Sequence, residues 1–204
     1  MQPGSSQAPR VRVAVASPDQ RVAIMRICTD VYAVANAAHA PATPWDLAPV
    51  LDQQSVYIIA TRAQQVLGFI GITPPTSPRY ALETYLPRDQ LPISFDAYTY
   101  ELRLLTVDRD HRRSRLAALL MYAAFRWVAA QGGTRIVAVS QRDNLTLFEH
   151  VGLRPVGPAV CMDTGEYVIL SAMVADMREA QRPLIPFIQR LEAVVEWDLG
   201  VPFL

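Results

Sequence analysis

Arginines gather in a short stretch between a strand-like run and a long apolar run. The run before them, 95–107, alternates as a β-strand does, and the run after them, 115–131, has the composition of a buried helix. The first backbone N–H groups of a helix are unpaired, and the helix dipole adds partial positive charge there. Cations at that terminus are unfavourable unless an anion offsets them, so this turn predicts a phosphate-like anion site. The arginines are Arg109, Arg112, Arg113 and Arg115.

The same turn has a simpler interpretation, which the residues alone leave open. Asp108 and Asp110 flank the first arginine and could pair with the cations in a solvated basic turn. A second pair of charges lies on the preceding strand, where Glu101 and Arg103 share one face because alternate strand residues point the same way. These two side chains could form an ordinary ion pair or could handle protons.

The composition favours one globular domain and limits its partners. The chain has 204 residues, of which 51% are hydrophobic, which is enough for a single well-filled core. A formal net charge of zero predicts no general attraction to nucleic acid or to an anionic membrane surface. All 19 basic residues are arginine, so Schiff-base and carbamate chemistry on a lysine is excluded.

The cysteines and the N-terminus favour a cytoplasmic protein. Cys28 and Cys161 lie far apart in apolar surroundings, which predicts two buried thiols in a reducing compartment. Residues 1–10 lack the apolar core of a signal sequence and are expected to form a disordered leader. No cluster of histidines, cysteines and carboxylates has metal-ligand spacing, so no metal site is expected.

Strands and helices alternate along the chain, which predicts a single α/β domain over residues 11–177 that would position the charged side chains described above. Apolar periodicity and turn signals predict helices at 20–38, 45–54, 115–131, 145–150 and 186–197. They predict strands at 11–16, 55–61, 66–73, 95–107, 136–140, 156–161 and 166–174. Residues 178–204 are expected to form a C-terminal helix and tail that pack on the body or on a partner subunit, which leaves a homodimer open.

A proline-rich excursion interrupts this pattern between 74 and 92. Loops of such length in a compact domain are usually functional or disordered, and the aromatic residues favour function. We expect the segment 80–100, with Tyr80, Tyr85, Tyr98 and Arg88, to form an acceptor or acyl-chain lid, although a purely structural loop fits the residues equally well.

The element order and two short motifs resemble the GNAT superfamily of N-acetyltransferases. The acyl-donor motif of that family, a strand ending in valine and then Arg/Gln-x-x-Gly-x-Gly/Ala opening a helix, corresponds here to Val107 and the run 112–117. A second family motif, an aromatic residue followed by two polar residues, an aliphatic residue and glycine, corresponds to 148–153. The resemblance implies a mixed central sheet with a splayed parallel pair of strands, flanking helices and an acyl-thioester donor.

Two positions depart from the family pattern. Arg115 replaces the central glycine of the donor loop, where the family brings backbone N–H groups close to a pyrophosphate without a Cβ atom. A guanidinium there could itself bind phosphate. Phe148 stands where many members have a tyrosine that protonates the leaving thiolate, so water, a backbone group or another tyrosine would have to serve instead.

The Glu101–Val107 strand, the Arg112-Arg113 pair and the 148–157 segment are similar to one branch of the superfamily. That branch contains the N-acyl amino acid synthases and the acyl-homoserine-lactone synthases. It implies a donor that is an acyl-CoA or an acyl-phosphopantetheine on an acyl carrier protein, an acidic partner suited to an arginine cluster.

The resemblance also implies roles for individual residues. Glu101 would be the general base that deprotonates the acceptor amine, with Arg103 orienting it or holding an acceptor carboxylate. A backbone N–H near Leu105 or Thr106 would polarise the thioester carbonyl. Ser140, on the neighbouring strand, would line the acceptor side. The donor itself would contact Leu105, Thr106, Val107, Arg112, Arg113, Ser114, Arg115, Leu116 and Ala117.

The function that follows is transfer of an acyl group from a CoA or carrier-protein thioester to a small-molecule amine by direct attack. Two alternatives stay open on the sequence. One is an acetyl-CoA-dependent acetyltransferase of small amines. The other is a non-catalytic GNAT-like module that only binds an acyl thioester or a partner protein, which the departures at Arg115 and Phe148 would suit.

Overall fold

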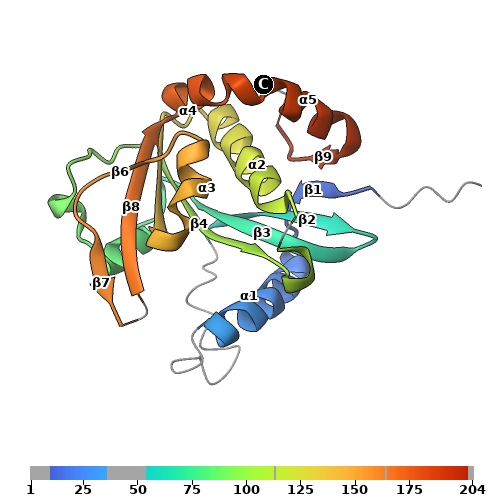
Figure 1. Cartoon of the computed structure of the whole chain (residues 1–204), viewed down its shortest axis with the longest axis horizontal. Coiled ribbons are helices and arrows are strands. Elements are labelled where there is room, and N and C mark those ends of the chain that lie inside the picture. The colour runs from blue at the N-terminus through green and yellow to red at the C-terminus, as the bar shows by residue number, and fades with distance from the viewer. Residues whose placement is uncertain (1–9, 36–53, 113, 164, 202–204) are drawn as a thin grey trace, which may run out of the picture.

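The fold is described from a computed structural model, which covers residues 10–35, 54–112, 114–163 and 165–201. Figure 1 shows a twisted sheet with helices on both faces. The helices are α1 (Arg21–Ala35), α2 (Leu116–Ala130), α3 (Leu145–His150), α4 (Val174–Ala180) and α5 (Ile185–Val194). The strands are β1 (Arg12–Val15), β2 (Val56–Arg62), β3 (Gln65–Thr73), β4 (Thr99–Val107), β5 (Arg135–Gln141), β6 (Arg154–Pro155), β7 (Val160–Met162), β8 (Gly165–Met173) and β9 (Glu196–Asp198).

In the described part of the chain these strands form one mixed sheet in the order β6-β8-β5-β4-β3-β2-β1-β9, and β7 pairs with β8. The sheet is antiparallel except at two places, β4 beside β5 and β1 beside β9. The predicted fold class, a mixed α/β sheet with a parallel pair, flanking helices and a C-terminal helix, is therefore confirmed.

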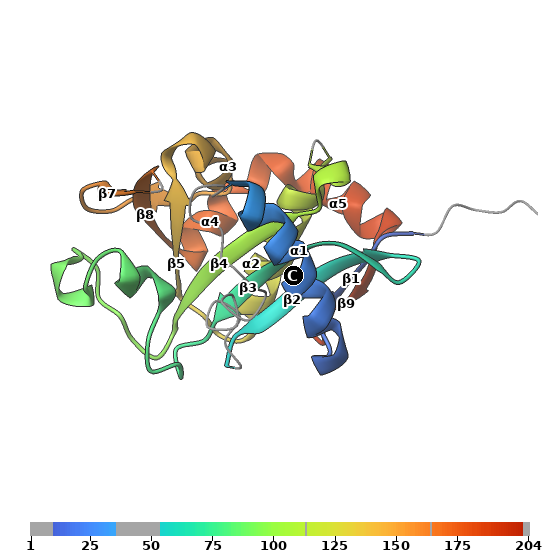
Figure 2. The ribbon, with the colours of Figure 1, turned by 90° about the horizontal axis from the view of Figure 1, so that it is seen from below.

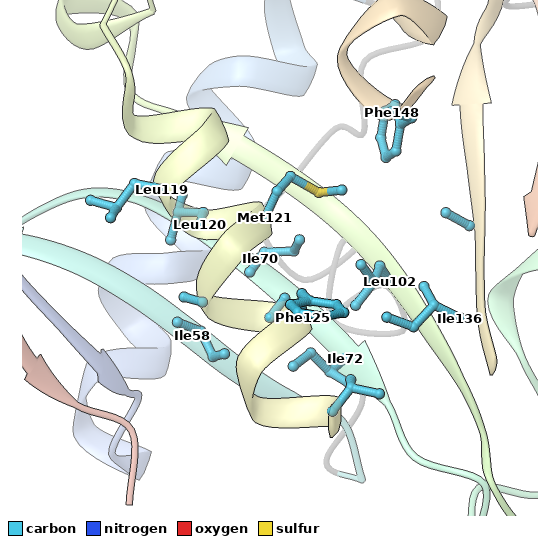
Figure 3. Close-up of a cluster of buried hydrophobic side chains, with 14 of the residues drawn as sticks. Ile58, Ile70, Ile72, Leu102, Leu119, Leu120, Met121, Phe125, Ile136 and Phe148 are labelled. Carbon is cyan, nitrogen blue, oxygen red and sulfur yellow. The ribbon is translucent and has the colours of Figure 1, made fainter. Parts of the chain in front are cut away.

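Helix α2 packs across the centre of one sheet face and forms most of the main core (Figure 3). Its apolar side chains meet those of β2, β3, β4 and β5, so the helix is buried over most of its length, as its composition predicts. At its C-terminal end the chain turns tightly at Gly132 and Gly133, where any Cβ on Gly133 would lie 2.4 Å from Val128 and 2.9 Å from the Tyr100 ring. The end of α2 therefore packs closely against Tyr100 of β4, just before β5 begins.

The opposite face of the sheet is covered by α1 and by the proline-rich excursion (Figures 1 and 2). Helix α1 buries Ile24, Ile27 and Cys28 against β2 and β3. The excursion between β3 and β4 contains two 3-10 turns, Ala81–Thr84 and Arg88–Gln90, and packs an apolar cluster against β5 and β8. The strand β4 reaches both covers, since Glu101 accepts hydrogen bonds from the excursion and Leu104 packs on the cluster formed with α1.

The C-terminal segment differs from its prediction. The helix ends at Val194 rather than Trp197, and Glu196–Asp198 then adds to β1 as a parallel edge strand. Val195 is extended and buried, and Leu199 is also buried, so these apolar residues are better satisfied against the core than on another turn of helix. Helix α4 follows β8 directly, and the sequence analysis missed it.

Three further predictions change or go untested in the structure. The strand predicted at 95–107 begins only at Thr99, because Asp96 accepts hydrogen bonds from the Tyr98 backbone N–H and the Thr99 hydroxyl in a turn. Cys161 was wrongly predicted to be buried; it lies exposed on the short strand β7, whereas Cys28 is buried as expected. The helix predicted at 45–54 falls almost wholly outside the described residues.

Candidate functional site

The parallel strands β4 and β5 are paired over only about the first half of their length. They pair from Thr99 and Arg135 as far as Leu102 and Ala138, but β4 continues to Val107 and β5 to Gln141. The backbone groups that face each other beyond that point are not joined in a ladder. A buried backbone polar group needs a partner, so this wedge is suited to a ligand that carries amides of its own.

A β-bulge lies on the β4 side of the wedge. Between the pairs Phe69–Thr106 and Gly71–Arg103, β4 has two residues where β3 has one. One of the two, Leu104, has a φ of 54°, a left-handed conformation that a leucine seldom adopts. Bulges re-aim the backbone next to them, and strained backbone of this kind concentrates at functional sites. The Thr106 hydroxyl stabilises the bulge by donating to the Leu104 carbonyl at 2.9 Å.

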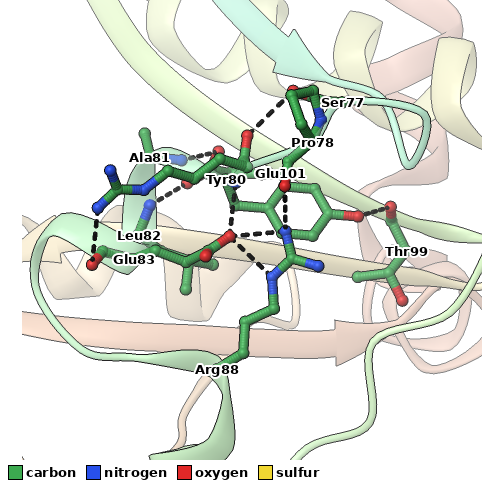
Figure 4. A network of polar contacts seen from close by, with 10 residues as sticks. Ser77, Pro78, Tyr80, Ala81, Leu82, Glu83, Arg88, Thr99 and Glu101 are labelled. Carbon is green, nitrogen blue, oxygen red and sulfur yellow. Dashed lines mark hydrogen bonds and ion pairs between the residues drawn. The ribbon is translucent and has the colours of Figure 1, made fainter.

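Glu101 lies on β4 just before the wedge and is almost fully buried, at 1% exposure. Its two carboxylate oxygens accept hydrogen bonds from the backbone N–H groups of Ala81, at 2.8 Å, and Leu82, at 2.7 Å (Figure 4). Burial raises the pKa of this carboxyl, while these two hydrogen bonds, the Arg103 charge and a hydrogen bond with Thr73 oppose the rise. Each oxygen keeps acceptor capacity beyond its N–H partner.

Arg103 follows on the same face, two residues nearer the bulge, where its Cγ would lie 3.2 Å from a Cβ built on Gly71. Its charge lowers the pKa of Glu101, which places the two side chains in one electrostatic environment. Tyr85 belongs to the same environment, since Glu101 and Arg103 both act on its pKa. Burial and the neighbouring Tyr167 raise that pKa, and the two tyrosine rings lie 4.8 Å apart between centroids.

Hydrogen bonds and cation–π contacts among its own side chains stabilise the excursion (Figure 4). Glu83 accepts from the Tyr80 backbone N–H and from Arg88 Nε, both at 2.7 Å. The Arg88 guanidinium lies 4.5 Å from the Tyr80 ring centroid and 5.4 Å from that of Phe95. Tyr80 is buried and donates its hydroxyl to the Thr99 carbonyl at 2.7 Å.

This network bears on the predicted lid. Tyr80 and Arg88 are engaged inside the excursion, so their predicted contact with substrate stays a prediction. Tyr85 instead reaches the neighbourhood of Glu101 and Arg103. Ser140 is buried at the far end of β5, and its hydroxyl donates to the Gln141 carbonyl at 2.9 Å.

The arginine turn follows β4 as a single 3-10 turn, Arg109–His111, before α2. Arg109 donates to the backbone carbonyl of Asp30 and so ties the turn to α1. Arg112 is exposed, and Arg113 lies outside the described residues. The Asp108 side chain caps the turn by accepting a hydrogen bond from the backbone N–H of Asp110, and it also lies 3.4 Å from His111 Nδ1. Within the described part of the turn, neither aspartate forms an ion pair with an arginine, so the simpler interpretation of a turn neutralised by these pairs is not seen there.

The beginning of α2 carries the remaining residues predicted to contact the donor. Arg115 is the N-cap with φ −81° and ψ 9°, a conformation open to any residue, so the loop does not require glycine there. The Ser114 hydroxyl accepts from the Leu116 backbone N–H at 3.3 Å. The Leu116 side chain is buried in the core, and Ala117 is half-buried.

The structure thus gathers the predicted residues into two groups joined by β4. Glu101 and Arg103 lie on the face covered by the excursion, and the turn 108–117 lies at the far end of the strand. Leu105 and Val107, which are half-buried, and Thr106, which is buried, connect the groups along the edge of the wedge. Sequence reasoning missed Thr73 and Tyr167, which no motif marks and which only strand pairing brings to this place.

Phe148 has no polar function in this arrangement. It lies on α3 and points toward Met121 of α2 in the main core (Figure 3). Among the described residues no group of histidine, cysteine and carboxylate side chains could hold a metal ion. None of the described helices has the length and apolarity needed to cross a bilayer.

A mixed sheet in which the pairing of two parallel strands ends beside a bulge, with a helix starting after the first of them, is the arrangement of a GNAT-like domain. The model of the acetyltransferase (GNAT) family matches residues 23–153. The chain belongs to this family. No curated protein sequence matches the chain.

Solved structures of the same fold match most of the chain. A CoA-dependent acyl-homoserine lactone synthase, BjaI, matches with a TM-score of 0.71 and 17% identity over 96% of this chain and 95% of its own. The protein TofI, in a ternary complex with an inhibitor and MTA, matches with a TM-score of 0.64 and 20% identity, covering 84% of this chain and 95% of its own. An aminoglycoside 6′-acetyltransferase of type Ii matches with a TM-score of 0.56 and 15% identity, covering 79% of this chain and 96% of its own. At these identities the likeness concerns the fold.

Proposed function

We propose that this protein is an N-acyltransferase that moves an acyl group from a CoA thioester to a small-molecule amine by direct attack. The observation that carries the proposal is the end of β4–β5 pairing at Leu102 and Ala138, directly before the bulge at Leu104. The wedge is lined by backbone amides, and a pantetheine arm has two amides that can join both edges.

The bulge supports a place for the reacting carbonyl. Leu105 lies in the bulge, outside the register of both the β3–β4 and the β4–β5 ladders, so its backbone N–H is the candidate that can point into the wedge, whereas Thr106 pairs with Phe69 of β3. Such a donor, fixed before the reaction, stabilises the oxyanion that forms as the amine adds to the thioester carbonyl. Its rigidity comes from the strand and from the Thr106 hydroxyl.

Glu101 is proposed to take the proton from the attacking amine. Its burial supports this role, because desolvation raises the pKa of a carboxyl toward that of a useful base. In the step itself the C–N bond forms, the C–S bond breaks and the thiolate leaves. The ammonium proton passes to Glu101 directly or through a water molecule, and solvent protonates the thiolate, since Phe148 supplies no hydroxyl.

Arg103 is proposed to recognise the acceptor. It lies on the face of Glu101 and beside Tyr85, and a guanidinium binds a carboxylate bidentately. An acceptor amine that also carries a carboxylate, as an amino acid does, would therefore be favoured. One structure of the neighbouring synthase BjaI contains SAM, which carries an amino-acid group, and this supports an amino-acid-derived acceptor.

The donor is proposed to be an acyl-CoA rather than an acyl carrier protein. Neighbours of this fold include two synthases described as CoA-dependent, BjaI and MesI. Of the turn arginines, Arg109 donates to a backbone carbonyl of α1, which leaves one cation fewer for an acidic protein partner. A cytoplasmic location, where CoA thioesters are made, is part of the same proposal.

Donor binding tests the proposal before any acceptor is known. The protein is heated with acetyl-CoA, a long-chain acyl-CoA or an acyl carrier protein, each at a hundredfold excess over its Kd, where a true ligand adds about 2.7 kcal/mol of stability. An acyl-CoA is expected to raise the melting temperature. A shift with the carrier protein alone would reassign the donor, a preference for acetyl-CoA would favour a small-amine acetyltransferase, and no shift with any donor would contradict the proposal.

A further inference from the structure

The guanidinium of Arg115 is stacked on an aromatic ring from the C-terminal helix. Its Cζ atom lies 5.2 Å from the ring centroid of Phe187, on the first turn of α5. Stacking of this kind covers one face of the guanidinium and leaves its N–H groups free to point outward in their own plane. None of the ion pairs among the described residues includes Arg115. Its donors are therefore available at the N-terminus of α2.

Contacts farther along α2 hold the helix α5, which carries Phe187, and the strand β9 that follows it. The Tyr122 hydroxyl of α2 donates to the Glu192 carboxylate of α5 at 2.9 Å. Arg126, which is 1% exposed, lies 3.7 Å from the same carboxylate and 4.7 Å from the Trp197 ring centroid. The contacts occur in the same order along α2 and along the C-terminal segment, so α5 and the strand β9 that follows it are fixed beside α2 from Phe187 to Trp197.

We infer that Phe187 is a positioning residue that orients Arg115 toward the phosphate groups of CoA, and so sets donor affinity. The inference rests on the proposed function, in which the beginning of α2 binds the donor. An arginine that is already oriented loses less rotamer entropy when it binds a phosphate than one that moves freely in solvent. The C-terminal segment thereby takes part in donor binding without touching the thioester.

Calorimetry with two ligands separates this role from plain packing. CoA carries the phosphates, and pantetheine has the same arm without them. Replacing Phe187 by leucine (F187L) is expected to weaken CoA binding about two- to fivefold, the worth of one exposed cation–π contact, and to leave pantetheine binding unchanged. F187Y keeps the ring and should bind CoA as the wild type does. V194A, an exposed position on the same helix, serves as the matched control.

A double-mutant cycle completes the test. Arg115→Gln alone should weaken CoA binding, and adding F187L to it should cause no further loss, because both substitutions remove the same interaction. The inference is overturned if F187L weakens both ligands equally, if its effect persists beside Arg115→Gln, or if it has no effect. It is also overturned if the wild type does not bind CoA. A wild type that binds CoA but transfers no acyl group would instead contradict the proposed function alone.

Discussion

Glu101 combines two demands that usually exclude each other, since its carboxylate both anchors the backbone of Ala81 and Leu82 and is proposed to accept a proton. Replacing it by glutamine is expected to lower kcat/KM about 10²–10⁴-fold, the usual contribution of a general base. Glu83→Gln is the matched control, because Glu83 also anchors the excursion, through Tyr80 and Arg88. A comparable loss in both variants, measured by steady-state kinetics, would mean that Glu101 only holds the segment.

The raised pKa of Glu101 gives this assignment a pH signature. The activity of the wild type should fall as the pH drops through that pKa, and the Glu101→Gln variant should lack this limb. The stability of the folded protein should instead fall as the pH rises. The reason is that Glu101 binds its proton more tightly in the folded state than in the unfolded state, where a glutamate has a pKa of about 4.3. From there up to the folded pKa, the wild type should lose stability relative to the variant as the pH rises, which urea unfolding at several pH values can follow.

The two cysteines differ in reactivity because they differ in burial. Burial raises the pKa of the Cys28 thiol to about 11, and Cys161 is exposed. At pH 8 only about one Cys28 thiol in a thousand is a thiolate, which is the reactive form. A thiol reagent should therefore modify Cys161 within minutes and Cys28 only after unfolding, as mass spectrometry of the peptides would show. Equal labelling of both in the folded protein would contradict the packing of α1.

At the scale of elements, β4 and β3 set the shape of the wedge. A Cβ on Gly68 would lie 2.7 Å from the Thr106 carbonyl oxygen, so Gly68→Ala pushes on β4 at the bulge. Gly133→Ala meets comparable clashes with Val128 and Tyr100, away from the open end of the wedge. Both variants should lose about 1–3 kcal/mol of unfolding free energy. Only Gly68→Ala is expected to raise the KM for the donor as well; equal donor KM values would contradict a donor site beside the bulge.

The elements that the sequence predicted best are those whose signals are local. The run 115–131 is apolar on every face and ends at two glycines, so α2 could be predicted within a residue at each end. The strand β9 could not, because its three residues become a strand only through pairing with β1, almost the whole chain away. Cys161 was misplaced for the same reason: its neighbours are apolar, but β7 lies at an edge of the sheet.

The candidate site also contains residues that local patterns predict and contacts that only the folded chain brings about. Glu101, Arg103 and the turn 108–117 follow from strand periodicity and motif spacing. The partners of Glu101 do not, because the backbone N–H groups of Ala81 and Leu82 reach it only through the path of the excursion. The stacking of Arg115 on Phe187 likewise depends on how α5 returns to α2, which no local pattern records.

At the scale of the whole molecule, the C-terminal segment is fastened to α2 by a buried charge. Arg126 is 1% exposed beside Glu192, so Glu192→Ala leaves a buried cation with a lost partner and also removes the hydrogen bond from Tyr122. The expected loss is about 2 kcal/mol of unfolding free energy. Glu196→Ala breaks an exposed pair with Arg12 and should cost at most about 0.5 kcal/mol. Chemical unfolding that ranks the two the other way would contradict this view of the segment.

The central claim is that the wedge between β4 and β5 binds an acyl-CoA for attack by an amine. It is tested most directly by mixing the protein with an acyl-CoA and a set of amines with and without a carboxylate, and measuring CoA release and the mass of the product together. The account predicts release that depends on the amine, an amide product in equal amount, and faster transfer to the amines that carry a carboxylate. Absence of any amide with every acyl-CoA and amine, from a folded protein, would contradict it.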